Sequence, residues 1–190
     1  MILERFEMES SNPVSTPIAT GTKLLKATDD NELVEQKQYQ SMVGSQMYAM
    51  LCTRPDIAYG VSQVSQYNSN PSHTHEAAVK RILKYLNGTK DWGITYNGKN
   101  STLKLEGYSD ADHGSGEDRK SISGYIFILA GGAVSWSSKK QSTTALSSTE
   151  AEYMALLQAA KEVIWIQQLL SDLGRNSEDK TSLRKTTKAL

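Results

Sequence analysis

Residues 107–114 have the sequence GYSDADHG, and residues 147–155 have the sequence SSTEAEYMA. The first segment ends a run of alternating apolar and polar residues that begins at Leu103, which predicts a half-buried strand. The second segment opens a run with helical spacing. Carboxylates brought together from a strand and a helix are what a magnesium-dependent phosphodiester-cleaving site requires. The two segments therefore predict an α+β fold with a paired-carboxylate site.

The composition is that of an ordinary globular chain of 190 residues, 38% hydrophobic and 22% charged. Lys plus Arg and Asp plus Glu both number 21, so the formal net charge is zero and only a local basic face could bind nucleic acid. One cysteine, Cys52, excludes an internal disulfide and a multi-cysteine zinc site. Cys52 falls within an apolar helical pattern, which predicts a buried structural thiol.

The sequence carries no signal for export or for a membrane. Its first residues lack the long apolar run of a signal peptide, and no apolar run approaches the roughly 20 residues of a membrane span. We therefore expect an intracellular protein of the cytoplasm or nucleus, with no membrane partner and no small-molecule substrate.

In the first third of the chain, a segment with little regular spacing of apolar residues precedes a predicted helix. Residues 1–10 predict a short amphipathic helix, and residues 11–31 are rich in Ser, Thr, Pro and Gly, which predicts an extended linker. Apolar residues between Tyr39 and Leu51 then recur at three- and four-residue spacing, which indicates an amphipathic helix. A helical block over 32–91 begins there.

Two more helices complete the predicted helical block. Pro55 suits the first turn of the second helix. Ser72 or Thr74 suits the cap of the third helix, and the pair Asn87-Gly88 predicts that this helix ends in a left-handed C-cap.

Five basic residues are candidates for nucleic-acid binding. Three lie on the third predicted helix and two follow the last predicted strand: Lys80, Arg81, Lys84, Lys139 and Lys140. Such residues could follow a phosphate backbone. A charged face is more often only a solvated face, so both interpretations stay open.

From residue 92 the pattern changes from a helical period to a strand period. A short strand is predicted at 93–96, and longer strands are predicted at 103–110, 123–129 and 133–138. Because short connections join the last three strands, they predict an antiparallel meander.

A long helix over 147–173, ended by Gly174, follows the meander. The sheet and this helix give a second predicted domain over 92–174. Residues 175–190 are mostly Ser, Thr, Lys, Arg and Asp with neither period, which predicts a disordered tail.

The long helix offers two carboxylates near its start, and they have different expected roles. Ser147 followed by Glu150 fits a capping box, in which Glu150 serves the helix terminus. Glu152 shares the face of Ala155 and Ala159, which should pack on the sheet, and an acidic residue on a packing face needs a reason. Metal ligation is such a reason, and simple exposure at the helix entrance is the alternative.

The strand offers Asp110 and Asp112. Asp110 closes the strand, where its side chain can project into a cleft, so it is the first candidate for metal binding and catalysis together with Glu152. Asp112 is a second-rank candidate, because aspartates are common in turns. His113 is a candidate base, with an exposed loop histidine as the more ordinary interpretation.

Four stretches of the second domain resemble the RNase H domain of copia-type retrotransposon Pol polyproteins. They are GYSDAD at 107–112, RKSISGY at 119–125, SWSSKKQ at 135–141 and LSSTEAEY at 146–153. The helical block resembles the reverse transcriptase thumb and connection of the same polyproteins, through YQSMVGS at 39–45, TRPDI at 53–57 and LKYLNGT at 83–89.

The resemblance implies an RNase H fold with a mixed five-stranded sheet, Mg²⁺ as cofactor and cleavage of RNA in an RNA–DNA hybrid by four carboxylates. By motif, Asp110 matches the first aspartate of the family and Glu152 its glutamate. Partners implied by the family are a hybrid or another nucleic acid, and other parts of the polyprotein.

The sequence also departs from that pattern. No Tyr-x-Asp-Asp motif occurs, and the family's Cys-Asp-Asn strand, which carries the third acid, and its fourth acid have no counterpart. We therefore expect the later strands to be missing, the strand at 103–110 to be an exposed edge, and Mg²⁺ to bind weakly.

Whether the chain is an enzyme stays open. We expect a truncated relative with little or no activity alone. The alternatives are a non-catalytic module that binds nucleic acid or polyprotein, and the remnant of a decayed element.

Overall fold

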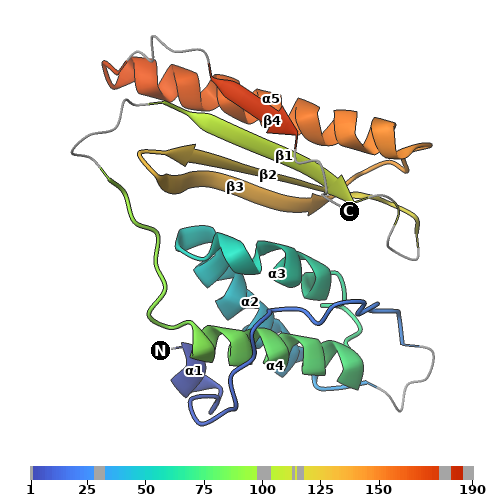
Figure 1. Cartoon of the computed structure of the whole chain (residues 1–190). Helices are drawn as coiled ribbons and strands as arrows, with labels where there is room; N and C mark the ends of the chain where they lie inside the picture. Colours follow the sequence, from blue (N-terminus) through green and yellow to red (C-terminus); the bar gives the residue numbers. More distant parts are fainter. Residues whose placement is uncertain are drawn as a thin grey trace. The chain divides into compact units, whose positions relative to one another are not determined.

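The structure is a computed structural model that describes residues 2–27, 33–97, 104–112, 114, 118–175 and 181–185. The chain divides into two compact units, Met1–Gly93 and Ile94–Leu190, and each is described by itself (Figure 1). The first unit is helical and the second is a four-stranded sheet with one long helix, so the predicted α+β class is confirmed. Within the described residues, no helix has the length and apolar character needed to cross a bilayer.

The described residues of the helical unit form four α-helices and a 3₁₀ turn. They are α1 (Ile2–Arg5), α2 (Gln36–Cys52), η2 (Pro55–Ile57), α3 (Ala58–Ser65) and α4 (His73–Gly88). One buried hydrophobic cluster joins α1, α2, α3 and α4, with Tyr39, Ile82 and Leu83 fully buried in it. The Tyr39 hydroxyl donates to the Val64 carbonyl across α2 and α3 at 2.7 Å.

The buried face of α2 differs from the predicted one. Tyr39, Met42, Val43 and Gln46 are buried, whereas Met47 and Leu51 are exposed. The prediction that Cys52 is buried is wrong, because Cys52 lies past the end of that face and its thiol is exposed.

The ends of α4 show one prediction confirmed and one wrong. Ser72 is the N-cap, and its backbone N–H donates to the His75 Nδ1 at 2.9 Å. Gly88 does not adopt a left-handed C-cap; it is the last residue of the helix, and Thr89 caps it with a φ of −130°. The Thr89 hydroxyl donates to the Tyr85 carbonyl and so satisfies part of this helix end.

A hydrogen-bonded cluster of polar side chains joins η2 to the end of α4 in the helical unit. Arg54 is 7% exposed, and its guanidinium donates to both oxygens of Asp56 and to the Thr89 carbonyl. The Tyr85 hydroxyl donates to Asp56 at 2.8 Å. Burial would raise the pKa of the Asp56 carboxyl, but the hydrogen bonds from Arg54 and Tyr85 hold that pKa below its ordinary value. Because these bonds satisfy the guanidinium, the burial of Arg54 beside the partly exposed Asp56 is tolerated.

The predicted linker over 11–31 is in part a packed segment. Its described residues lie on the helices, with Val14 and Ile18 packed against the core. The Tyr67 hydroxyl donates to the Leu24 carbonyl, and the Asn87 amide donates to the Ser11 carbonyl. Because these contacts come from residues far along the chain, local composition does not predict them.

The sheet unit contains the predicted antiparallel meander, which is confirmed. Its strands are β1 (Glu106–Asp112), β2 (Ile122–Leu129) and β3 (Gly132–Lys140), and helix α5 (Ser148–Asp172) follows. The turn between β2 and β3 is made by Ala130 and Gly131, both with positive φ, as a tight hairpin requires. The short strand predicted at 93–96 is not formed, although the Asn97 N–H donates to the Ala130 carbonyl.

Two predictions about the end of the chain are wrong. Residues Ser182–Lys185, within the segment expected to be disordered, form strand β4. Strand β4 pairs parallel with β1, giving the strand order β3-β2-β1-β4, so β1 is an inner strand and a later strand is present (Figure 1). Residues 176–180 and 186–190 lie outside the described residues.

The core of the sheet unit lies between the sheet and α5. Leu105, Phe127, Ala159 and Ile166 are its buried members, and Leu183 of β4 packs against them. Gly107 explains how β1 accommodates this core, because a side chain there would collide with the Phe127 ring and with Leu183.

Candidate functional site

Asp110 and Glu152, the two predicted metal ligands, line the same pocket. The pocket has a volume of about 230 Å³ and lies between β1 and the first turns of α5. Ser109, Thr149, Tyr153 and Leu156 complete its lining. Both carboxylates are half-buried. The arrangement places two acidic groups in a partly apolar cleft, where oxygen ligands attract a hard cation.

The position of Asp110 follows from the pairing of β1 with β4. The pairs run from Glu106 with Ser182 to Ser109 with Lys185. Asp110 is the next residue of β1, directly beyond the described pairing with β4. A side chain at that point is beside the end of a neighbouring strand, a common place for a ligand-binding residue.

The start of α5 is fixed by its cap. The Ser147 hydroxyl accepts from the Glu150 N–H at 3.1 Å, as the capping pattern predicts. The Glu150 carboxylate accepts from the Leu146 N–H at 2.6 Å, one residue before the cap. Glu150 is therefore engaged at the helix terminus, which leaves Glu152 as the carboxylate of this helix that lines the pocket.

Small residues bring α5 close to the sheet. Ala151, Ala155 and Ala159 are all buried, one helical turn apart. The helix face that packs on the sheet is therefore the predicted one.

Gln141 is a supporting residue that the sequence did not single out. It is 2% exposed, and its amide donates to the Ser123 hydroxyl at 2.8 Å and to the Ala151 carbonyl at 2.9 Å. It thus ties the start of α5 to β2. Gln141 ends the SWSSKKQ stretch, but a glutamine after two lysines is typical of a polar loop, so the local sequence does not indicate its burial.

The lesser candidates have different positions. Asp112 is the last residue of β1, within the strand and not in a turn, and it is not among the residues that line the pocket. His113 lies outside the described residues. Within the residues that the structure describes, no three His, Cys, Asp or Glu side chains gather as a metal-binding group.

The residues of the pocket fit a magnesium site only in part. Two carboxylates suit one Mg²⁺ that keeps several waters and takes further oxygens from a substrate phosphate. Strand β4 passes beside β1 with the residues Ser182, Leu183, Arg184 and Lys185, none of which is acidic. A third carboxylate on these strand residues is therefore excluded by the sequence.

The five basic candidates lie in both units and differ in their surroundings. Lys80 forms an ion pair with Glu76 at 2.9 Å, and Lys140 forms one with Asp118 at 2.9 Å. The hydrogen bond from Lys140 lowers the pKa of the Asp118 carboxyl. Lys139 is exposed on β3, whereas Arg81 and Lys84 line a pocket of the helical unit.

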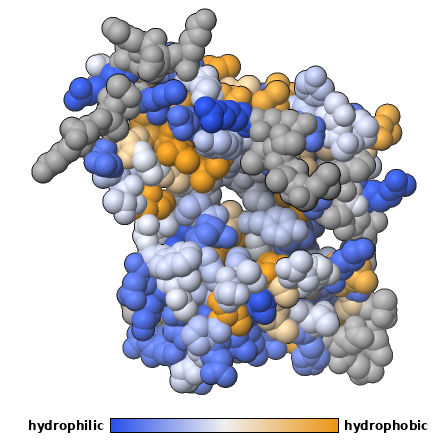
Figure 2. Space-filling view, viewed as in Figure 1, coloured by the Kyte–Doolittle hydropathy of each residue, from blue (hydrophilic) through white to orange (hydrophobic). Residues whose placement is uncertain are grey.

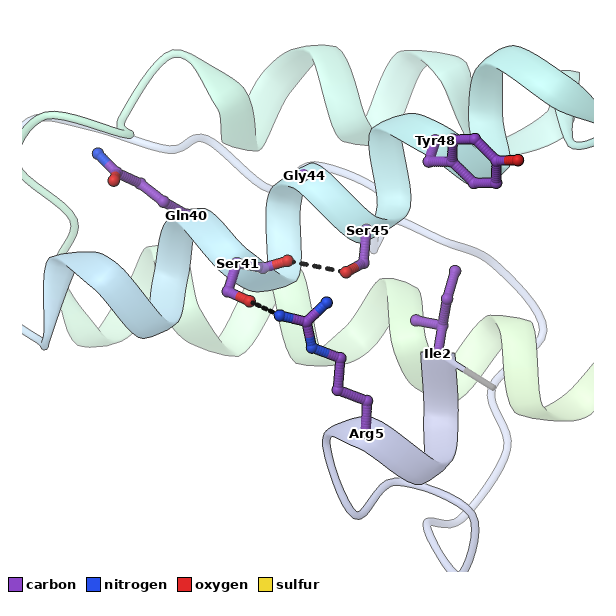
Figure 3. A pocket seen from close by; sticks show the side chains of 7 residues that line it. All are labelled: Ile2, Arg5, Gln40, Ser41, Gly44, Ser45 and Tyr48. Carbon is purple, nitrogen blue, oxygen red and sulfur yellow. Dashed lines mark hydrogen bonds between the residues drawn. The ribbon is translucent and has the colours of Figure 1, made fainter.

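Another pocket of the helical unit lies between α1 and α2 and has a volume of about 560 Å³. Figure 3 shows Arg5 reaching from α1 toward Ser41, whose hydroxyl accepts from the guanidinium at 2.9 Å. Ser45 in turn donates to the Ser41 carbonyl. The one cation among these lining residues is therefore already hydrogen-bonded within the chain.

Apolar side chains are exposed on α5. Tyr153, Leu157 and Ile164 lie on the helix face opposite its buried alanines, and Trp165 lies beside them. Hydrophobic side chains reach the surface of the sheet unit in Figure 2 as well. Part of this helix is thus uncovered within the described residues.

Fold and site together define a mixed α+β protein with a two-carboxylate pocket. The chain is 46% identical over 184 residues, 94% of its length, to the retrovirus-related Pol polyprotein from transposon TNT 1-94 of Nicotiana tabacum. It is 44% identical over 174 residues to the Pol polyprotein from transposon RE2 of Arabidopsis thaliana, which covers 91% of the chain. The chain is thus homologous to one segment of the retrovirus-related Pol polyproteins of copia-type transposons.

The chain spans only a small part of those relatives, 14% of the tobacco polyprotein and 12% of the Arabidopsis one. It is also 54% identical over 129 residues to the secreted RxLR effector protein 161 of Plasmopara viticola, which covers 67% of this chain and 90% of that protein. Neither a family model nor a solved structure matches the chain.

Proposed function

We propose that the sheet unit is a partial RNase H-like domain and that Asp110 and Glu152 form half of its magnesium site. The helical unit then corresponds to the thumb and connection that precede this domain in the polyprotein. The observation that carries the proposal is that the two carboxylates, from β1 and α5, line one pocket. The strand order and the parallel β4 support it, because the family resemblance implies a mixed sheet.

The two carboxylates have a direct role in this proposal. They would hold one Mg²⁺ through their oxygens, at the pocket where a phosphodiester could approach. When bound, the ion supplies Lewis-acid stabilisation of a phosphate and a more acidic water. Ser109 and Thr149 add hydroxyls to the pocket, and Gln141 keeps the start of α5 against the sheet.

With only these two carboxylates in the pocket, we infer that the chain has little or no cleavage activity by itself. Two carboxylates hold a hard cation weakly without help from substrate oxygens. Loss of one member of a concerted catalytic group commonly costs orders of magnitude in rate. We infer that activity, where it exists, needs acidic residues from outside the described part of the chain.

A cleavage assay tests this proposal. The purified chain is incubated with a labelled RNA–DNA hybrid and Mg²⁺, with a known active RNase H as a positive control on the same substrate. The expected result is no cleavage above that of the Asp110→Asn and Glu152→Gln variants. Cleavage that both substitutions abolish would disprove inactivity and keep the site. Cleavage that both variants retain would remove the site assignment.

A non-catalytic binding module is the second candidate. It is favoured by a pocket of about 350 Å³ between the N-terminal segment and α4, which we call the basic pocket because Arg81 and Lys84 line it. The cleavage proposal does not require this pocket. Binding of nucleic acid in EDTA, where no divalent cation is available, separates this role from cleavage.

A further inference from the structure

Helix α5 carries an apolar ridge on the face opposite its buried alanines. Tyr153, Leu157 and Ile164 of this ridge are exposed, and Ala160 between them is half-buried; we call these four residues the α5 ridge. They follow one another at spacings of four, three and four residues. Alternating spacings of four and three are typical of residues through which two helices pack along a seam. The α5 ridge therefore has the pattern of a helix–helix interface.

The α5 ridge is complementary to a second copy of itself when the two helices run antiparallel. A two-fold axis midway along the ridge makes each residue contact a different residue of the other copy. Leu157 of one copy then faces the small Ala160 of the other, and Tyr153 faces Ile164. Because a large side chain meets a smaller one at each level, the two ridges can approach closely.

The charges of α5 favour this antiparallel pair over other uses of the ridge. Lys161 is the one basic residue in Ser148–Asp172, whereas four residues of the helix are acidic. A helix that lies on an anionic membrane carries Lys and Arg along its polar face, and α5 does not. In a parallel pair the two Lys161 side chains would lie side by side. In the antiparallel pair they are separated by five residues along the helix axis, or about 7.5 Å.

The exposed surface is sufficient for a weak pair. Tyr153, Leu157 and Ile164 are 67%, 58% and 66% exposed, and the neighbouring Trp165 is 58% exposed. Since burial of an aromatic side chain removes about 150–250 Å² from water, and of an aliphatic one less, these four expose roughly 400–500 Å² per copy. Two copies would bury roughly 800–1,000 Å², near the lower limit of specific interfaces. The expected Kd is therefore on the order of 10–100 μM.

We propose that the α5 ridge is the interface of a weak antiparallel homodimer of this chain. Tyr153 also lines the carboxylate pocket, so the second copy would cover part of the rim of that pocket. In the antiparallel register Ile164 and Trp165 of the second copy would approach this rim, and neither is acidic. The dimer therefore adds no metal ligand there, and the proposal does not depend on cation binding.

Sedimentation equilibrium of the full chain tests the proposal, over about two decades of concentration around the expected Kd. The weight-average mass should rise from 21.0 kDa toward twice that value. The double variant Leu157→Gln, Ile164→Gln should raise the Kd at least about tenfold, because it removes apolar contacts at the centre of the interface. Leu173→Gln is the matched control, since Leu173 is also 67% exposed but lies off the ridge. Its Kd should stay within about twofold of the wild type.

A disulfide cross-link tests the direction of the helices. In a Cys52→Ser background, one chain carries Tyr153→Cys and a second, tagged chain carries Ile164→Cys, so each chain has a single thiol. In a mixture with oxidised glutathione, the antiparallel pair should link the tagged chain to the untagged one. Preferential linking of each variant to itself would indicate a parallel pair and contradict the proposal.

Circular dichroism shows whether each variant is folded. If the double variant is unfolded, Leu157→Glu alone decides, and it should raise the Kd at least about tenfold. Three results would overturn the proposal: a mass of 21.0 kDa at every concentration, association of the double variant like that of the wild type, or an equal loss in Leu173→Gln. A monomeric chain that binds vesicles of anionic lipid through the α5 ridge would assign the ridge to a membrane and overturn it as well.

Discussion

The helical unit and the sheet unit differ in the size of their buried hydrophobic clusters among the described residues. In the helical unit one cluster extends through α1, α2, α3 and α4, and the ion pair of Arg54 and Asp56 lies at the end of α4. In the sheet unit a smaller described cluster lies under α5, while Tyr153, Leu157 and Ile164 of that helix are exposed. Each buried cluster among the described residues lies within one unit.

The carboxylate pocket belongs to the sheet unit, which has the smaller buried cluster. Its two acids rest on β1 and α5, whose packing depends on a few residues such as Phe127 and Gln141. The basic pocket belongs to the unit with the larger core. This difference leads us to expect that binding by the helical unit is more robust to mutation than cation binding by the sheet unit.

Phe127→Ala should have the largest effect and should separate the two units. Phe127 is fully buried, and truncation of such a side chain costs about 3–5 kcal/mol of unfolding free energy. Hydrogen exchange should show loss of protection in the sheet unit and retained protection in α2 and α4. If protection falls equally in both units, they share one cooperative core and the comparison fails.

Arg54→Ala should have the opposite effect: it should destabilise the helical unit and not the sheet unit. It removes the guanidinium that bonds Asp56, whose side chain is 30% exposed, and the Thr89 carbonyl, at a cost of about 2–3 kcal/mol. Urea denaturation measures this cost. Tyr85→Phe is the matched control, because it removes only one hydrogen bond to Asp56 and should cost about 1 kcal/mol. Equal costs for the two variants would show that the ion pair is not what closes this unit.

Gln141→Ala should have a smaller effect, confined to the sheet unit. It removes the bonds to Ser123 and to the Ala151 carbonyl, at about 1–3 kcal/mol. Gln168→Ala removes an exposed bond to Asp172 on the same helix and should change unfolding by less than about 0.5 kcal/mol. If both variants unfold like the wild type, Gln141 does not hold the start of α5.

Much of the fold followed from local pattern, and the exceptions have physical causes. The meander, the long helix and the capped start of α4 were predictable, because alternation, helical spacing and capping residues act over a few positions. Strand β4 was not predictable, because Ser-Leu-Arg-Lys has one apolar side chain. Its strand form comes from pairing with β1 and from the contact of Leu183 with the core.

The site was predictable in part for the same reason. Capping logic and the small-residue face of α5 separated Glu152 from Glu150, and the structure brings Glu152 to the pocket of Asp110. The contribution of Gln141 was not predictable, because its bonds join residues that are distant in sequence. The packed N-terminal segment was missed similarly, and with it the pocket of Arg81 and Lys84.

The most direct measurement of the central claim is a titration of the isotope-labelled chain with Mn²⁺, a paramagnetic substitute for Mg²⁺, followed by NMR. We expect weak binding, with amide signals broadened first around Asp110 and Glu152. Excess Mg²⁺ should reverse the broadening, and the double variant Asp110→Asn, Glu152→Gln should abolish it there. Broadening that is centred elsewhere, or that persists unchanged in the double variant, would contradict the claim that these two carboxylates form half of a metal site.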